Sequence, residues 1–368
     1  MFFINRSLYT REQVDSLSRI NYGQIRLAQK PVKLYKYYPD TVSLESGKNH
    51  SQEALEHNTV FLQDPLKFDD PYDSTICLDQ NQFYIERLKY YAELCGFVYN
   101  DEWDYGRLEY EFSVFLYPKA QNLDSFLEAF KVKGSNDDIL DLTHHNFALN
   151  MWLAFINNKG QEDCWQSAFY SALSREYTEV QKNLAGHFRM ACFTTNPYSM
   201  LMWAHYANSH KGFCIEYAFP SFDDPKDEHL TFNLFPVVYS DERVSVLKYC
   251  LMDMASSNVT EEVLWPIYKY GLLTKSLDWM YQNEWRLISC DDLLTDKGKA
   301  DYTCTFSPIT KVYLGAKMPL KRRKDLVKYC ADRGIPTTCV APATAQFAMQ
   351  DCAGRFVNRN CLLSAEQR

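Results

Sequence analysis

One long block with helical spacing interrupts a chain whose remaining parts consist mostly of short strand-like runs. Apolar residues recur at about every 3.6 positions in residues 80–95, 122–132 and 164–184. On both sides of this block, aromatic and β-branched runs stop at Pro, Asn or Asp. Because the helices do not alternate regularly with the strands, the pattern predicts an α+β fold rather than a doubly wound parallel sheet.

The expected elements define three parts of the chain. The strand-like runs lie at 32–38, 59–62, 188–194, 213–217, 235–240, 283–288, 310–315 and 336–340, and further helices are expected at 51–55, 199–207, 260–276 and 319–333. We therefore expect an N-terminal helical extension at 1–31, a single α+β domain at 32–341 with a helical insertion at about 80–187, and a C-terminal tail at 342–368.

Charge and cysteine usage narrow the class of protein. The net charge of −8 argues against a broad duplex-binding surface. The run Lys321-Arg322-Arg323-Lys324 is read as a solvated helix face, with a local nucleic-acid patch as the alternative. The chain has 12 Cys but no CxxC, no signal peptide and no apolar run long enough to span a bilayer. These features predict reduced thiols and a cytoplasmic protein without a membrane partner.

Several common enzyme motifs are absent. The sequence contains no GxGxxG after a strand, no GxxxxGK[ST], no GxSxG and no HExxH. Their absence lowers the odds of a dinucleotide dehydrogenase, a P-loop enzyme, an α/β-hydrolase and a zincin. It says little about enzymes whose sites are dispersed along the sequence.

Two early segments offer polar groups for a site. Lys36 stands inside the aromatic run Leu34-Tyr35-Lys36-Tyr37-Tyr38. It either points to solvent or holds an anion or ribose while the tyrosines stack on a ring. Phe68-Asp69-Asp70-Pro71-Tyr72-Asp73 reads as a turn with capping carboxylates. Its functional alternative is an Asp that binds a ligand or supports the site, and Asp70 is our candidate.

Two later segments complete the candidate set. In the stretch from His205 to His210, the two histidines are five positions apart and share a helix face poorly. They belong to a polar network, contact a ligand, or join acidic partners at a metal. Glu284 and Arg286 share one face of a strand, where opposite charges can hold each other ionised. They form a structural pair or a carboxylate poised in a cleft.

Taken in order, these segments resemble a bacterial family, the domain of unknown function numbered 2971. Its members show LYKY, FNDPFD, MWxHYAxxHxGFCIEY, VxYSDE, EWR and IYLG, which here correspond to Leu34–Tyr37, Phe68–Asp73, Met202–Tyr217, Val238–Glu242, Glu284–Arg286 and Val312–Gly315. Asp69 departs from the Asn usual in the family. The match covers about residues 32 to 341, and the His-Tyr stretch is its most specific part. The family resembles abortive-infection proteins, which implies a phage-defence or toxin–antitoxin setting and a defence-operon partner.

More remotely, the segment order resembles the ADP-ribosyltransferases. That resemblance implies a split or mixed β-sheet core with an early basic strand, an aromatic second strand and a later Glu strand, although Lys36 stands where those enzymes have His or Arg. It implies NAD as substrate and a protein or nucleic-acid target. The implied catalytic residues are Glu284, His205 and Tyr206, and the implied cofactor-binding residues are Lys36, Tyr35, Tyr37, Asp70 and Arg286, with no metal ligand among them. A non-catalytic sensor or interaction module and a metal-dependent nuclease or hydrolase remain the alternatives.

Overall fold

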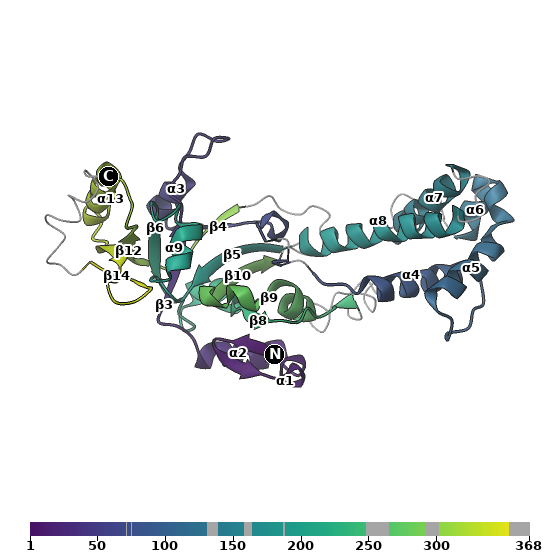
Figure 1. The fold of residues 1–368 in the computed structure, drawn as a ribbon, viewed down its shortest axis with the longest axis horizontal. Helices are drawn as coiled ribbons and strands as arrows, with labels where there is room; N and C mark the ends of the chain where they lie inside the picture. Colours follow the sequence, from purple (N-terminus) through teal and green to yellow (C-terminus); the bar gives the residue numbers. More distant parts are fainter. Residues whose placement is uncertain are drawn as a thin grey trace. The chain divides into compact units, whose positions relative to one another are not determined.

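The chain divides into two compact units, shown together in Figure 1. The computed structural model describes residues 1–70, 72–74, 76–130, 139–157, 164–186, 188–247, 265–290 and 302–352. The first unit, here called the sheet unit, comprises residues 1–75, 185–243 and 256–368, and the second, the helical unit, comprises 76–184 and 244–255. Helices and mixed sheets together confirm the predicted α+β class.

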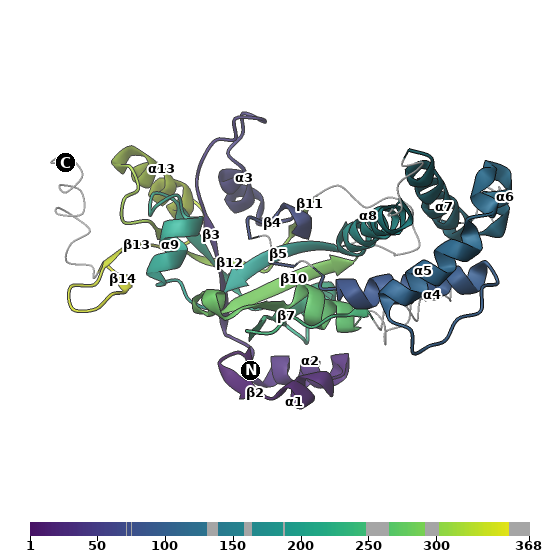
Figure 2. The same cartoon turned by 45° about the vertical axis from the view of Figure 1, so that its right-hand side comes forward.

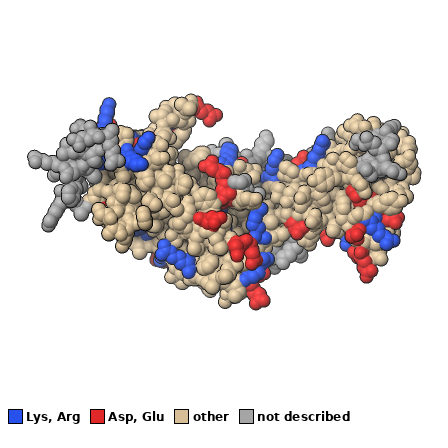
Figure 3. Space-filling model, in the orientation of Figure 1, with Lys and Arg blue, Asp and Glu red and all other residues tan. Residues whose placement is uncertain are grey.

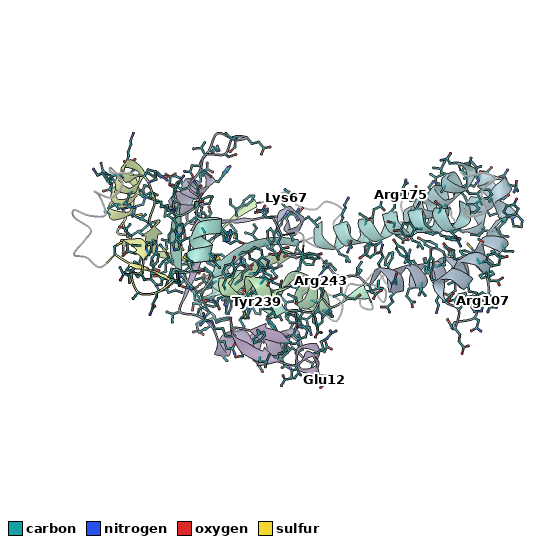
Figure 4. The ribbon with its side chains drawn as sticks, in the orientation of Figure 1. Glu12, Lys67, Arg107, Arg175, Tyr239 and Arg243 are labelled. Carbon is teal, nitrogen blue, oxygen red and sulfur yellow. The ribbon has the colours of Figure 1, made fainter. Side chains whose placement is uncertain are left out.

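Helices make up most of the described part of the helical unit. They are α4 (Gln80–Leu94), α5 (Tyr105–Leu116), the short η2 (Lys119–Gln121), α6 (Leu123–Ala129), α7 (Ile139–Asn157) and α8 (Cys164–Gly186). The side chains of Asp79, Asp104 and Asn122 accept backbone N–H groups at the starts of α4, α5 and α6. Arg107 on α5 and Arg175 on α8 mark this unit in Figure 4.

The sheet unit is built on a mixed eight-stranded sheet. Its order is β14 (Met349–Asp351), β13 (Thr337–Pro342), β12 (Ile309–Leu314), β6 (Phe213–Ala218), β3 (Lys33–Tyr38), β5 (Phe188–Thr194), β10 (Glu284–Cys290) and β7 (Leu234–Pro236). Neighbouring strands are antiparallel except β12 and β13, which run parallel. The long strands fall where the aromatic and β-branched runs predict them.

The two faces of this sheet bury different clusters. On one face, Leu34 and Trp285 pack with apolar side chains of α3 (His50–His57) and α13 (Leu320–Ala331). On the other, Tyr37 meets Trp203 of α9 (Met200–Tyr206) edge to face, with ring centroids 5.1 Å apart. Figure 2 shows α3, α9 and α13 beside the sheet. Alternation along β3 therefore decides which side chains α9 covers.

Smaller sheets complete this unit. One has the order β2 (Ser7–Tyr9), β1 (Phe2–Ile4), β8 (Val238–Ser240) and β9 (Thr274–Ser276), and the other pairs β11 (Tyr302–Thr305) with β4 (Thr59–Leu62). The remaining elements are α1 (Arg11–Asp15), α2 (Arg19–Ala28), η1 (Pro65–Lys67), η3 (Pro225–Asp227), α10 (Glu228–Asn233), η4 (Ile267–Leu272) and η5 (Leu277–Gln282).

The N-terminal segment differs from the helical extension expected at 1–31. Its helices α1 and α2 are preceded by β1 and β2, and β1 pairs with β8. Phe2 and Ile4 are fully buried through this pairing. A strand of three residues is too short to be predicted from an alternating pattern. The burial of Phe2 and Ile4 stabilises this strand.

The helix expected at 260–276 is wrong at its C-terminal end. Residues 260–264 lie outside the described part, and the π-helical η4 occupies Ile267–Leu272. The chain then turns into β9, which pairs parallel with β8 over Thr274–Ser276. Pairing with a distant strand overrides the local helical pattern here.

The segment after 341 is not a plain tail in its described part. Strand β13 continues to Pro342, and β14 pairs with it antiparallel, with Val340 opposite Asp351. Residues 353–368 lie outside the described part.

The basic run of α13 does not form a fully solvated patch. Arg322 donates two hydrogen bonds to Asp40, each 2.7 Å long. Arg323 is buried and donates to the carbonyl of Gly315 at 3.1 Å. On the face shown in Figure 3, blue and red side chains are interspersed rather than separated by sign. Two of the four basic side chains therefore anchor the helix instead of offering charge to nucleic acid.

A buried carboxyl makes the stability of the helical unit depend on pH. Burial raises the pKa of Glu109 to about 7, although the Tyr105 hydroxyl donates to it at 3.0 Å. A raised carboxyl pKa stabilises the folded state fully below the ordinary value of 4.5, and this contribution is lost as pH rises to about 7. We expect Glu109→Gln to raise the unfolding temperature of the helical unit above pH 7, and to change it little in mild acid. Calorimetry of this variant and of the exposed control Glu128→Gln checks this, and equal behaviour of the two contradicts it.

Candidate functional site

A cavity of about 820 Å³ opens in the sheet unit. It lies where β3 and β5 pair through a single position, Tyr35 opposite Thr194. In contrast, β3 pairs with β6 over six positions, and β5 pairs with β10 over seven. Consecutive residues of both β3 and β5 line the cavity because the two strands separate beyond that one pair. The volume falls in the range of small-molecule sites, about 300–1,000 Å³.

Most of the residues predicted as a site meet at this cavity. The lining residues include Tyr35, Lys36, Tyr37, Asp70, His205, Tyr206 and Glu284. Arg286 does not line it, since its side chain is fully buried behind Glu284. The cavity therefore brings together four segments that are far apart in the sequence, although their functional roles stay predictions.

Three members of a closed ring of four charged side chains, Asp73, Lys275 and Glu284, line the cavity. Lys275 Nζ lies 2.7 Å from Asp73 Oδ2 and 2.8 Å from Glu284 Oε2. Arg286 Nη2 lies 2.6 Å from Asp73 Oδ1, and its Nε lies 2.7 Å from Glu284 Oε1. All four side chains are at most 7% exposed. Each carboxylate thus bridges both cations, and each cation bridges both carboxylates.

The ring holds Glu284 ionised despite its burial. Burial alone would raise the pKa of Glu284, but the charges of Arg286 and Lys275 outweigh it and hold that pKa well below its usual range. For Lys275, burial acts to lower the pKa, and the charges of Glu284 and Asp73 raise it well above its usual range instead. Glu284, Lys275 and Arg286 remain charged together because each has opposite charges as neighbours in the ring.

Further hydrogen bonds orient the ring. Arg286 Nη1 donates to Ser74 Oγ at 2.8 Å, and the Tyr239 hydroxyl accepts the backbone N–H of Glu284 at 2.8 Å. Tyr239 is labelled in Figure 4. These bonds satisfy donors that would otherwise be buried without partners.

Lys36 lines the cavity and has no carboxylate partner among the described residues. Its Nζ donates to the carbonyl of Cys192 at 3.0 Å and lies 5.5 Å from the Phe193 ring centroid. Burial lowers its pKa, and the more distant charge of Glu284 acts in the opposite direction. An ammonium has three donors, so two of them remain for a ligand.

Cys192 in the cavity wall is a neutral thiol. Burial raises its pKa to about 12, with the charge of Glu284 adding to the effect. Since the thiolate is the nucleophilic form, this side chain contributes packing rather than covalent chemistry at neutral pH.

The two histidines of the His205–His210 stretch have different surroundings. His205 lies exposed in the last turn of α9 and lines the cavity. His210 does not line it and belongs to a turn in which Asn208, Ser209 and His210 all have positive φ. Across the described part of the chain, no group of three or more His, Cys, Asp and Glu side chains is placed to hold a metal ion.

Close backbone approaches explain the glycines near this turn. A Cβ added at Gly212 would lie 2.0 Å from the carbonyl oxygen of Tyr38, and one at Gly315 would lie 2.2 Å from that of His210. The stretch that looked most specific in sequence is therefore partly a packing motif that seats α9 against β3, β6 and β12.

The acidic turn divides into two roles. Asp70 lines the cavity, and its Oδ1 accepts the backbone N–H of Tyr72 at 2.9 Å, as expected for a capping carboxylate. Asp73 is the member that joins the charged ring. Pro71 lies outside the described part.

Sequence reasoning missed Asp73 as an individual and missed Lys275 and Gln282 entirely. Gln282 Oε1 accepts from Lys275 Nζ at 2.8 Å, and its Nε2 donates to the Tyr206 hydroxyl at 2.8 Å. Lys275 was hidden because its segment was predicted as a helix. Asp73 could have been predicted from the sequence, since the turn Phe68–Asp73 was expected to offer an Asp that supports the site.

One comparison with known proteins matches part of the chain to a family without a described activity. Residues 202–287 match the model of a family described as "Protein of unknown function (DUF2971)". This segment contains His205, Tyr206, Lys275, Gln282, Glu284 and Arg286, and the match supports the resemblance to that family. No curated protein and no solved structure matches the chain. None of the helices in the described part is both long enough and apolar enough to cross a membrane.

Replacing Glu284 should reduce stability strongly. In Glu284→Gln, Arg286 and Lys275 stay charged and buried but lose one of their two counter-charges. Breaking a buried ion pair from one side costs about 3–5 kcal/mol of unfolding free energy. Urea unfolding of this variant and of the exposed control Glu45→Gln measures the effect. A loss for Glu284→Gln no larger than that of the control would contradict the ring as described.

The same carboxylate predicts a stability change in acid. Because the folded-state pKa of Glu284 is lowered, its contribution is complete above the ordinary value of 4.5 and is lost as pH falls through the lowered value. Wild type should therefore lose stability below that pH more steeply than Glu284→Gln. Unfolding free energies measured along an acid series test this, and parallel curves for the two proteins would contradict it.

Proposed function

We propose that the cavity binds NAD and that the protein is an ADP-ribosyltransferase acting on a macromolecular target. The observation that carries the proposal is the convergence of Lys36, His205, Tyr206 and Glu284 on one cavity of about 820 Å³. The proposal includes a bacterial anti-phage setting, which rests on the family resemblance, and leaves a protein or a nucleic acid as the target.

Lys36 supports a ligand with negative charge. Its ammonium has two unused donors in the cavity and no carboxylate at ion-pair distance in the described part. A lysine of this kind acts as a point charge for a phosphate. The pyrophosphate of NAD is a suitable partner, and the Tyr35 and Tyr37 rings supply apolar surface nearby.

Glu284 supports the chemistry of the transfer. The bond between ribose C1″ and the nicotinamide nitrogen breaks, and nicotinamide leaves with the electron pair. The positive charge that develops on the ribose is stabilised by a carboxylate that Arg286 and Lys275 keep ionised. An acceptor oxygen or nitrogen then bonds to C1″, and His205, exposed at the cavity, takes its proton.

One observation favours a non-catalytic module instead. Both oxygens of Glu284 already bond to protein cations, so the ring is complete without a ligand. In that case the cavity would bind a small molecule as a signal, and no nicotinamide would be released. Substitution of Glu284 cannot separate the two functions, because either way it breaks the ring.

Thermal unfolding with and without NAD tests the proposal. A ligand that binds only the folded state stabilises it by about 2.7 kcal/mol at a hundred times its Kd. We expect NAD to raise the unfolding temperature of wild type and of Lys211→Met, whose lysine is exposed and outside the cavity. Lys36→Met, which removes the charge at similar length, should lose most of the rise.

Nicotinamide release from NAD in cell extract then separates the candidate functions. Binding together with release supports the transferase, whereas binding without release supports the sensor module. No shift of wild type in millimolar NAD, or equal shifts in all three proteins, would overturn NAD binding through Lys36.

A further inference from the structure

Lys275, Gln282 and Tyr206 form a row of hydrogen-bonded side chains in the cavity wall, and the donor and acceptor of each hydrogen bond in this row can be assigned. A lysine can only donate, so the oxygen of the Gln282 amide must face Lys275. The amide nitrogen consequently faces Tyr206, and since it can only donate, the Tyr206 oxygen accepts there. The chemistry of Lys275 thus decides an amide orientation that is otherwise ambiguous.

This arrangement leaves the proton of the Tyr206 hydroxyl without an acceptor in the described part of the chain. Tyr206 lines the cavity and is 38% exposed, so the proton can point into the cavity. Burial raises its pKa to about 12, which keeps the hydroxyl protonated at neutral pH. The side chain is therefore a donor of set direction.

Gln282 and Tyr206 are both held in place by further contacts. Gln282 is buried, and its backbone carbonyl accepts from Thr194 Oγ1 on β5. Helix α9 ends at Tyr206. In this helix Trp203 is fully buried, and its indole N–H donates to the carbonyl of Pro197 at 2.8 Å. Ordered supports of this kind are what a positioned ligand donor needs.

We infer that Gln282 is a positioning residue that directs the Tyr206 hydroxyl to donate to an acceptor oxygen of the ligand, either a carboxamide or a phosphoryl oxygen. This inference rests on the proposed binding of NAD and deepens it. It assigns Tyr206, which the family resemblance implies only as a catalytic residue, a hydrogen bond to the ligand.

Gln282→Glu tests the direction of the bond at nearly constant shape. A glutamate at position 282 still accepts from Lys275. In wild type the amide nitrogen of Gln282 donates to the Tyr206 oxygen, whereas the second carboxylate oxygen of the glutamate would accept the Tyr206 proton. The proton is then turned away from the cavity although Tyr206 is intact. We expect Gln282→Glu and Tyr206→Phe each to weaken NAD binding about tenfold, the size of one hydrogen bond.

A double-mutant cycle separates this effect from charge repulsion. Tyr206→Phe/Gln282→Glu should bind NAD no more weakly than Tyr206→Phe, because the proton is already gone. If the added negative charge simply repels the ligand, the double variant is about tenfold weaker again, and the inference is overturned. Gln350→Glu, an exposed position on β14 outside the cavity lining, controls for net charge.

Titrations with NAD and with ADP-ribose identify the acceptor. A Tyr206→Phe effect on NAD alone assigns the carboxamide, and an equal effect on both assigns a phosphoryl oxygen. If wild type binds NAD and all variants bind it equally, only the inference fails. If wild type binds neither ligand, the proposed function fails, and the inference fails with it.

Discussion

The ring formed by Asp73, Lys275, Glu284 and Arg286 is the interaction on which the sheet unit's cavity depends. Four charges removed from water carry a large desolvation cost, and only close, complete pairing offsets it. Each charge sits between two opposite ones, at 2.6 to 2.8 Å. The ring therefore fixes the acidic turn, β9 and the start of β10 relative to one another, because displacing any of them would leave a buried charge unpaired.

The cavity itself follows from weak pairing at the centre of the sheet. Full pairing of β3 with β5 would close the gap, but only Tyr35 and Thr194 face each other in register. Lys36 bridges the two strands beyond that pair through the carbonyl of Cys192. A side-chain hydrogen bond thus replaces part of the backbone ladder and puts a lysine amino group where the strands diverge.

Local patterns were enough to predict the strand residues of the candidate site. Lys36 stood out as one charge in an aromatic strand, and Glu284 with Arg286 as opposite charges on one strand face. These inferences depend only on period-two alternation, which the sequence shows directly. The shared cavity could not be predicted in the same way, because it depends on which strands separate.

Lys275 shows where sequence reasoning stopped. Its strand β9 has three residues and exists because β8 is available to pair with it, so no local period reveals it. Strand β1, in which Phe2 and Ile4 are buried, was missed for the same reason. Asp73 was visible in a turn, but its role requires knowing that Arg286 ends 2.6 Å away.

The closed ring and the open donors divide the cavity wall into two kinds of position. At Glu284, any substitution breaks bonds to two cations, so effects on stability and on ligand binding arise together. Lys36 and Tyr206 each use one hydrogen bond to the protein and keep donating capacity toward the cavity. A role in ligand binding can be assigned to Lys36 and Tyr206 because the protein itself does not use all of their hydrogen-bond donors. The ring contributes indirectly, since Lys275 fixes the orientation of the Gln282 amide, and the amide fixes the direction in which the Tyr206 hydroxyl donates its proton.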